Sequence, residues 1–228
     1  MMTATNCVHR VFGFMGLLAA GCAAGELSLG LPFSDNMVLQ ADGDAAVWGK
    51  AAPGAEVEIK FRDSSAKAKA GDDGSWQAAI AAGKAGGPFE LAVTAGETVA
   101  VKNVLVGQVW LGSGQSNMNM SLQDGRGGVL NAKEEIAQAK YPAIRFLQIA
   151  NGRDKHEPKY EGVWTECTPE TARHFSAALY FFARRLSEEL KCPVGVINAS
   201  QGGSPIKGWL IGGDLQKKCV ANLVPYSI

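Results

Sequence analysis

The sequence lacks an excess of charge of either sign, and this absence removes whole classes of function. Lys and Arg together number 22, and Asp and Glu also number 22, so the formal net charge is zero. Without a basic field for phosphate backbones, nucleic-acid binding is not expected. Hydrophobic residues make up 46% and charged residues 19% of the 228-residue chain, which excludes a disordered chain and a coiled coil. At ~150 residues per domain, the length predicts about one and a half domains.

The five cysteines lack the spacing of a metal site or of a disulfide framework. Cys7 and Cys22 lie near the N-terminus, whereas Cys167, Cys192 and Cys219 are far apart and form no C-x-x-C pair. One disulfide beside a free thiol, or three buried thiols, are both open. The H-E-x-x-H and EF-hand patterns are absent as well, so we expect neither a metal nor another cofactor.

A hydrophobic run long enough to span a membrane is also missing. The apolar run at 11–20 has about ten residues, and a helix of that length cannot cross a hydrocarbon layer ~30 Å thick. The run follows Arg10 in an acid-free segment and precedes small residues at 21–25, an order typical of a secretory signal peptide. We therefore expect residues 1–24 to be a signal peptide and the mature protein to be secreted or periplasmic. Lipoprotein processing at Cys22 is the alternative.

Glycine, in contrast, is plentiful, with 28 of 228 residues against about 7% in average proteins. Within residues 25–103 glycines stand at turn signals such as Pro53-Gly54 and Asp73-Gly74, and short alternating strands at 56–61 and 75–80 follow these turns. Turns every 8–12 residues without a helical period predict a β-sandwich. Nothing in this module indicates catalysis, so its expected role is structural or positioning.

From residue 104 to residue 228 the pattern is that of a parallel α/β domain. The apolar run at 104–111 predicts a strand buried on both faces. The elements expected after it are a helix at 131–140, a strand at 144–149, a helix at 176–191 and a strand at 194–198. Ser176 should cap the second helix, whose expected buried positions are Leu179, Phe182, Leu186 and Leu190. Glycine-rich loops at 112–118 and 199–205 then lie at the carboxyl ends of strands, where chemistry gathers in such sheets.

Ser116 is the candidate nucleophile in the first of these loops. A sharp strand-to-helix turn exposes a serine, and small neighbours such as Gly114 let a substrate carbonyl approach. The Ser116 backbone N–H would stand at a helix start and could face a developing oxyanion. The loop is neither the G-x-S-x-G elbow, because Met118 replaces the second glycine, nor a P-loop. An ordinary loop serine is the alternative interpretation.

The sequence VWLGSGQSNMNM at 109–120 closely resembles the nucleophile block of sialate O-acetylesterases, a family of the SGNH (GDSL-like) hydrolases. Further blocks that resemble the family lie, in the same order, at 31–40, 47–49, 53–55, 86–88, 175–183 and 194–209. The resemblance implies an N-terminal β-sandwich module followed by an SGNH-type three-layer α/β hydrolase domain. It also implies a serine esterase that removes acetyl groups from sugars or glycans.

By this resemblance Ser116 is the nucleophile and an oxyanion donor, and Gly202 or Gly203 supplies a further oxyanion N–H. Residues expected to contact the substrate are Gln115, Asn117, Ser204 and Trp209. A second tryptophan, Trp164, could also stack on a sugar, but packing in the core or at its rim is the default expectation for tryptophan. Gln201 and Lys207 depart from the Trp and Glu common in the family, which leaves the acyl and sugar preference open. The oligomeric state is open as well.

The family's general base is not expected in this chain. Relatives continue into a W-Y-Q-G-E-S strand and a later D-x-x-H block, and this sequence stops at Ile228, so the hydrolase domain is expected to be incomplete. Of the three histidines, His9 falls in the signal segment, and His156 and His174 fit solvated surface positions better than a base. The sequence therefore predicts an esterase by family. A catalytically inactive fragment, or a carbohydrate-binding or interaction protein on the same scaffold, is the alternative.

Overall fold

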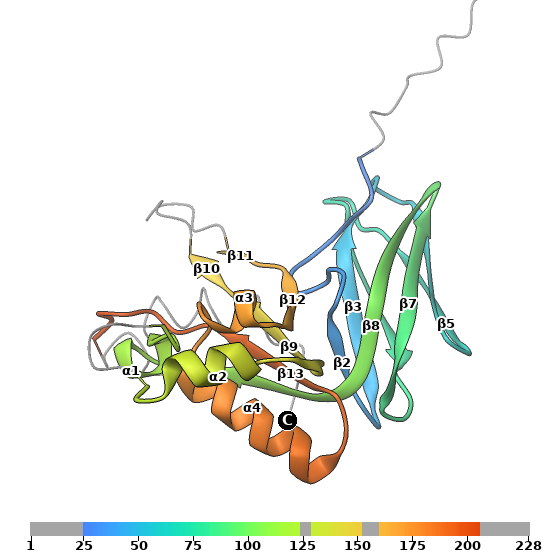
Figure 1. The fold of residues 1–228 in the computed structure, drawn as a ribbon. Helices are drawn as coiled ribbons and strands as arrows, with labels where there is room; N and C mark the ends of the chain where they lie inside the picture. The colour runs from blue at the N-terminus through green and yellow to red at the C-terminus, as the bar shows by residue number, and fades with distance from the viewer. Residues whose placement is uncertain (1–24, 124–128, 152–159, 206–228) are drawn as a thin grey trace, which may run out of the picture.

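The computed structural model describes residues 25–123, 129–151 and 160–205, and it contains a β-module and an α/β part that share one long strand (Figure 1). The expected signal peptide at 1–24 lies outside the described residues. Among the helices that are described, none is long and apolar enough to cross a membrane.

The β-module is built from two sheets that enclose one apolar core. One sheet is antiparallel, and its strands, in spatial order, are β1 (Ser28–Leu29), β3 (Asp44–Lys50) and β6 (Ser75–Ala81). The other contains β5 (Ser64–Lys69), β4 (Glu56–Phe61), β7 (Gly86–Ala95) and the first half of β8 (Glu97–Gly112). Alternate residues of both sheets, such as Val57, Ile59 and Ile80, are buried in the same cluster. Gly54 and Gly74 adopt φ of 77°, as the predicted turns require. The predicted β-sandwich is confirmed.

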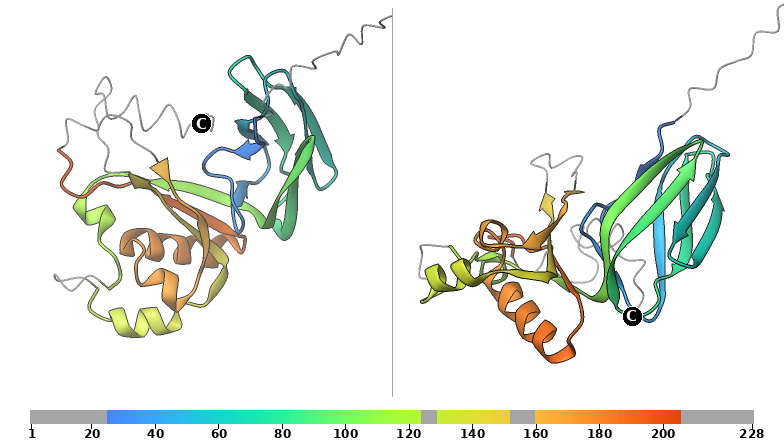
Figure 2. Two further views of the ribbon diagram at one scale, coloured as in Figure 1. Left: turned by 90° about the horizontal axis from the view of Figure 1, so that it is seen from above. Right: turned by 45° about the vertical axis from the view of Figure 1, so that its right-hand side comes forward.

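Strand β8 has 16 residues and continues from the module into the α/β sheet (Figures 1 and 2). Its first half pairs with β7, and β2 (Val38–Gln40) lies parallel to it at residues 105–107. Its second half pairs in parallel with β13 (Val194–Asn198), from Gln108 to Gly112. The change of partner falls at Gly107, where a Cβ would come within 2.0 Å of the Pro193 carbonyl oxygen. Glycine is therefore required where the strand passes from one part to the other.

The strands of the α/β sheet that the sequence predicts are parallel, as expected. Strand β9 (Tyr141–Gln148) pairs in parallel with β13, and β12 (Trp164–Cys167) adds an antiparallel edge. A short hairpin, β10 (Ala150–Asn151) and β11 (Tyr160–Glu161), follows β9. The helices are α1 (Ser116–Asn119), α2 (Ala132–Gln138), α3 (Pro169–Ala172) and α4 (Ala177–Leu190). Strand, helix and strand alternate along the chain, which confirms the α/β class.

The two faces of this sheet are covered by different parts of the molecule. Ile144 and Phe146 of β9 pack in one cluster with residues of α3 and α4. Leu147, one position further along the strand, belongs to the cluster of the β-module, together with Val38 of β2. The alternation of strand side chains thus places described helices on one face and module residues on the other. Trp164 is buried in the cluster of the β-module, as expected of a packing residue, and its Nε1 donates to the Pro32 carbonyl oxygen (2.8 Å).

Helix α4 begins as predicted but buries a different face. The Ser176 hydroxyl accepts a hydrogen bond from the Leu179 N–H (3.2 Å), so the predicted cap is present. Leu179 is buried, and Leu186 packs against the same cluster. Phe182 and Leu190, however, are exposed by 39% and 50%. The remaining buried positions are Ala177, Tyr180 and Ala183.

Candidate active site

The first glycine-rich loop turns the chain sharply at the carboxyl end of β8. Gly114 adopts φ of 133°, and helix α1 starts two residues later with Ser116 as its first residue. That φ is readily adopted only by glycine, so Gly114 is what allows the turn. The Asn119 and Met120 N–H groups donate to the Gln115 and Ser116 carbonyl oxygens (3.0 and 2.9 Å). These two hydrogen bonds close the single helical turn that begins at Ser116, the candidate nucleophile.

Ser116 is exposed at this turn, as the prediction requires of a nucleophile. Its Oγ donates to Oε1 of Gln115 (2.8 Å). A carboxamide is not basic, so this bond orients the hydroxyl without activating it. The Ser116 N–H lies in the first turn of α1, where backbone N–H groups have no carbonyl partner within the helix. A negative oxygen placed there would be stabilised by such groups.

The second glycine-rich loop meets the first because the pairing of β8 with β13 continues beyond both strands. The Ala199 N–H donates to the Gly112 carbonyl oxygen and the Gln201 N–H to that of Gly114, both at 2.8 Å. Residues 201–204 then form a turn in which the Ser204 N–H and Oγ both donate to the Gln201 carbonyl oxygen (3.2 and 2.7 Å). Gly203, within this turn, has φ of 78°. The structure therefore brings the loops of Ser116 and of Gly202 and Gly203 to one end of the sheet.

A hydrogen-bonded chain of polar side chains lies beneath these loops, and the sequence interpretation missed it. Asn198, the fully buried last residue of β13, donates through Nδ2 to Oε1 of Gln148 (2.8 Å). Its Oδ1 accepts from the N–H (3.1 Å) and the Oγ (2.6 Å) of Ser200. Ser200 Oγ is also 3.3 Å from Oδ1 of Asn119, in the last position of α1. Asn198 could have been found from the sequence, because it is a polar residue at the end of an otherwise apolar buried strand.

Asn119 connects the two loops from the side of α1. Its Nδ2 is 3.6 Å from the position where a Cβ on Gly202 would stand. Since Ser116 and Asn119 are three residues apart on a helical turn, their side chains share one face. Asn119 therefore borders the same space as the candidate nucleophile and the candidate oxyanion glycines.

The loop of Ser116 is anchored to the start of α4. The Ala177 N–H donates to the Met120 carbonyl oxygen (2.8 Å), and the Leu122 N–H donates to that of Phe175 (3.2 Å). At Gly112 a Cβ would come within 2.6 Å of Leu179. A larger residue at 112 would push α4 away from the sheet, so this glycine brings the helix close to the site.

The chemistry of the assembled loops is that of neutral hydrogen-bond donors. Residues 112–119 and 199–205 contain no Asp, Glu, Lys, Arg or His. Backbone N–H groups and the amides of Gln115, Asn117 and Asn119 are the polar groups available to a substrate. Such groups can stabilise a developing oxyanion without carrying a charge of their own. Gln115 and Asn117 are exposed beside Ser116, and their contact with substrate remains a prediction, as does that of Ser204.

Among the described residues, no basic side chain is recorded in a hydrogen bond with Ser116 Oγ, whose partner is Gln115. His174 is the histidine present in that part of the chain; it is exposed between α3 and α4, and its backbone N–H donates to the Thr171 carbonyl oxygen (3.3 Å). His9, His156, Lys207 and the predicted sugar contact Trp209 all lie outside the described residues.

The two cysteines in the described ranges are free thiols. Cys167 is buried and Cys192 is partly buried, whereas Cys219 falls outside these ranges. Burial raises the pKa of the Cys167 thiol to about 12, so this group is not poised as a nucleophile. Within the described ranges no three His, Cys, Asp or Glu side chains gather as metal ligands.

Comparison with known proteins places this chain in a family. A sequence model of the family "Carbohydrate esterase, sialic acid-specific acetylesterase" matches residues 106–225, just over half of the chain. The sialate O-acetylesterase of Homo sapiens is 32% identical over 206 residues, covering 80% of this chain and 38% of that protein. The Rattus norvegicus enzyme is 31% identical over 229 residues, covering 88% and 41%.

The solved structure of a carbohydrate acetylesterase from Xanthomonas citri has the same fold. It matches with a TM-score of 0.73 and 33% identity, over 81% of this chain and 43% of that one. The chain thus spans about two fifths of the length of the curated relatives it matches. The region matched by the family model includes Ser116 and both glycine-rich loops. This chain therefore belongs to the family of carbohydrate esterases described as sialic acid-specific acetylesterases.

Proposed function

We propose that the protein is a carbohydrate O-acetylesterase in which Ser116 is the nucleophile. The observation that carries this proposal is the hydrogen bond from the Gln201 N–H to the Gly114 carbonyl oxygen (2.8 Å), which joins the loop of Ser116 to that of Gly202 and Gly203. A serine hydroxyl and backbone donors from a second loop are the parts that acyl transfer requires.

In the proposed reaction Ser116 Oγ attacks the carbonyl carbon of an acetyl ester on a sugar. The carbonyl oxygen becomes an oxyanion, which the N–H groups of Ser116 and of Gly202 or Gly203 stabilise. The bond from the carbonyl carbon to the sugar oxygen then breaks, and this oxygen takes up the proton that a base removed from Ser116, so that the sugar leaves as an alcohol. Water next hydrolyses the acetyl-serine, which releases acetate and restores the Ser116 hydroxyl. Because Gln115 holds the resting hydroxyl, Ser116 must rotate away from Oε1 before a base can take its proton.

We propose acetylated sugars or glycans as substrates, with O-acetylated sialic acid as the first choice. The family match and the names of the relatives support this choice. The order of charged, apolar and small residues at 1–24 supports a secreted or periplasmic location, where extracellular glycans are met.

The test compares Ser116→Ala with Ser113→Ala, a matched change of an exposed serine in the same loop. Hydrolysis of 4-nitrophenyl acetate and of O-acetylated sialic acid is measured, with a fluorophosphonate probe and mass spectrometry to locate the reactive serine. We expect Ser116→Ala to lower kcat/KM by at least about 10³-fold and to abolish labelling, and Ser113→Ala to change kcat/KM less than about threefold. A Ser116→Ala protein that hydrolyses at the wild-type rate would overturn the assignment of Ser116. A wild-type protein with neither hydrolysis nor labelling would overturn the proposal that this chain is an esterase.

A further inference from the structure

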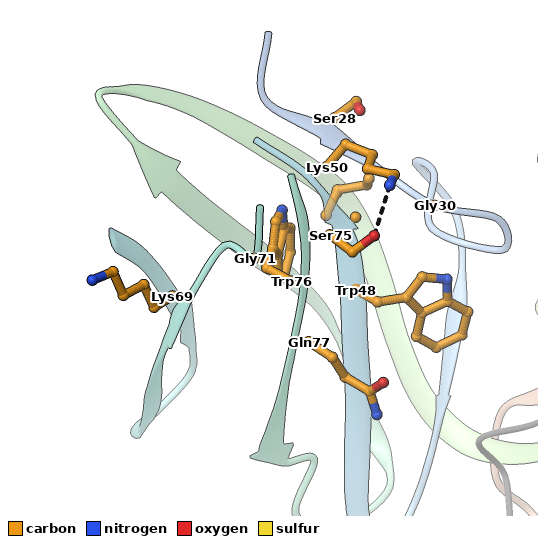
Figure 3. Close-up of a pocket in the computed structure, with 11 residues that line it drawn as sticks. Ser28, Gly30, Trp48, Lys50, Lys69, Gly71, Ser75, Trp76 and Gln77 are labelled. Atoms are coloured by element: carbon orange, nitrogen blue, oxygen red, sulfur yellow. Dashed lines mark hydrogen bonds between the residues drawn. The ribbon is translucent and has the colours of Figure 1, made fainter. Parts of the chain in front are cut away.

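The pocket on the β-module, drawn in Figure 3, does not gather its polar groups around one point. Gln77 is exposed on the outer side of β6, whereas its neighbour Trp76 is buried in the core. Lys50 and Ser75 both bond to the carboxylate of Asp73 (3.2 and 2.7 Å). The polar groups of the two glycine-rich loops, in contrast, converge on one space, and Asn119 is the side chain whose amide lies between the loops.

Asn119 directs the two ends of its side-chain amide to different neighbours. The single proton of the Ser200 hydroxyl lies mainly on Oδ1 of Asn198 (2.6 Å), with Oδ1 of Asn119 as its second acceptor (3.3 Å). Because the oxygen of Asn119 is the end next to Ser200, its Nδ2 is the end that faces the second loop. This nitrogen is 3.6 Å from the position that a Cβ would take on Gly202.

The hydrogen bonds beneath Asn119 have a fixed direction. Nε2 of Gln148 donates to the carbonyl oxygens of Ile149 (3.3 Å) and Asn198 (3.4 Å), so its Oε1 is the end that accepts from Nδ2 of Asn198 (2.8 Å). Oδ1 of Asn198 is then the end available to Ser200. Nδ2 of Asn119 is the last donor of this chain, and it has no hydrogen-bond partner among the described residues.

This free donor lies on the side of α1 that carries the candidate nucleophile. Ser116 and Asn119 are three residues apart in one helical turn, so their side chains share a face. Asn119 is exposed, and a ligand can therefore reach its amide. An ester carbonyl placed between Ser116 Oγ and the loop of Gly202 would have its oxygen next to Nδ2.

We propose that Nδ2 of Asn119 is a third oxyanion donor, beside the N–H groups of Ser116 and of Gly202 or Gly203. As the carbonyl oxygen gains negative charge, Nδ2 donates a hydrogen bond to it, while Oδ1 stays with Ser200. The amide transfers no proton, because a carboxamide neither gains nor loses one in this reaction. The inference rests on the proposed function, since the oxyanion forms only when Ser116 attacks an ester.

Two substitutions of Asn119 separate a catalytic role from a structural one by the order of their effects. Asn119→Asp keeps the shape of the side chain and an acceptor for Ser200, but it puts a carboxylate oxygen, ionised at neutral pH, in place of the donor. Asn119→Ala removes the amide and leaves room for a water molecule that can donate instead. Aspartate is therefore the more harmful change for an oxyanion donor, and alanine is the more harmful change for a residue that merely positions the loops.

The variants are compared by steady-state hydrolysis of 4-nitrophenyl acetate at neutral pH. We expect Asn119→Ala to lower kcat at least about tenfold and Asn119→Asp at least about 100-fold, with KM within about threefold of wild type in both. The rate at which a fluorophosphonate labels Ser116 should fall in the same order, because phosphonylation also places a negative oxygen at this site. Thermal unfolding should give an unchanged Tm, since Asn119 is exposed.

Gln123→Glu is the matched control. It converts an amide to a carboxylate at another exposed position of the same segment, four residues beyond Asn119, and should leave kcat within about threefold of wild type. A comparable loss in this variant would mean that added charge anywhere near the site lowers kcat, which would overturn the role of Asn119.

Two further results would also overturn it: a kcat of Asn119→Ala within about threefold of wild type, or a smaller loss in Asn119→Asp than in Asn119→Ala. If hydrolysis still depends on Ser116, these results reject the role of Asn119 and leave the esterase proposal standing. A wild-type protein with neither hydrolysis nor labelling would reject both proposals, because no oxyanion then forms.

Discussion

At the scale of single residues, some members of the candidate site can be predicted from their neighbours in the sequence and others cannot. Ser116 could be predicted because the turn that exposes it needs Gly114, and both are adjacent in the sequence. Asn119 gave no signal, since an asparagine in a polar helical turn is an ordinary surface residue. Its position beside Gly202 depends on Ser200 and Asn198, more than 75 residues away, which only the pairing of β8 with β13 brings near.

The two candidate oxyanion glycines should respond differently to alanine. At Gly203, φ of 78° strains any residue with a Cβ, so Gly203→Ala should lose about 1 kcal/mol and reshape the turn of 201–204. At Gly202 the added Cβ meets Asn119 at an ordinary 3.6 Å, so Gly202→Ala should fit without strain.

We expect Gly203→Ala to lower kcat for acetyl-ester hydrolysis by about tenfold or more, because it displaces an oxyanion donor whose complete loss costs roughly 2.7–4 kcal/mol of transition-state stabilisation. Gly202→Ala leaves the turn in place and should lower kcat by less than about threefold. Steady-state kinetics with 4-nitrophenyl acetate, beside urea unfolding, separate the effect on catalysis from that on stability. Equal kinetics of the two variants would show that the conformation of this turn does not control the oxyanion site.

At the scale of elements, helix α4 shows why the ends of a helix are easier to predict from sequence than the face that it buries. The cap at Ser176 and the stop before Pro193 depend on neighbouring residues, and the predicted 176–191 differs from Ala177–Leu190 by one residue at each end. The buried face depends on partners from elsewhere. Tyr180 is buried because its hydroxyl reaches Glu135 of α2, at 3.4 Å from the carbonyl oxygen and 3.3 Å from Oε2. The same burial raises the pKa of Tyr180. Tyr180 is therefore a core residue, although the polar hydroxyl of tyrosine gives no reason to expect full burial from the sequence.

Opposite changes of stability are expected at the two ends of α4. Ser176→Ala removes the side-chain acceptor of the Leu179 N–H and should destabilise the protein by about 1 kcal/mol. Lys191 ends the helix with φ of 51°, a left-handed conformation that is strained for a residue with a Cβ. Lys191→Gly should therefore stabilise the protein by roughly 0.5–1 kcal/mol. Urea unfolding monitored by circular dichroism measures both. A loss of stability in Lys191→Gly would mean that the lysine side chain contributes more than the strain removes.

At the scale of the whole molecule, a polar cluster fastens the β-module to the α/β part. Arg145 of β9 is 3% exposed and pairs with Glu166 of β12. Asn103 of β8 donates to the same carboxylate (2.8 Å) and to Asn36 of the module (2.7 Å), and accepts from Arg145 (3.3 Å). The sequence placed Arg145 in a strand but could not predict this cluster, because its members come from four distant segments.

This cluster predicts a dependence of stability on pH. The hydrogen bond from Asn103, followed by the pairing with Arg145, lowers the pKa of Glu166 below its usual value of 4.5. A lowered pKa stabilises the fold above the pKa of the unfolded chain, and this contribution is lost as the pH falls through the folded value. Acidification from about pH 5 to about pH 3 should therefore remove it.

Glu166→Gln should lower the Tm at neutral pH, because buried Arg145 loses its counter-charge, and should lower it less at about pH 3. Calorimetry of both proteins across this range measures the difference, and Glu161→Gln, an exposed carboxylate of β11, is the control. A gap between wild type and Glu166→Gln that is the same at every pH would contradict a role for the ionised carboxylate.

The passage of β8 through both parts has a consequence for how such proteins can change in evolution. Residues 103 and 104, where the sequence pattern shifts, are consecutive members of one hydrogen-bonded strand. A recombination breakpoint there would cut a strand that pairs with β7 on one side of Gly107 and with β13 on the other. It would also part Asn103 from Arg145 and Glu166. The β-module and the α/β part should therefore be inherited together rather than exchanged by recombination.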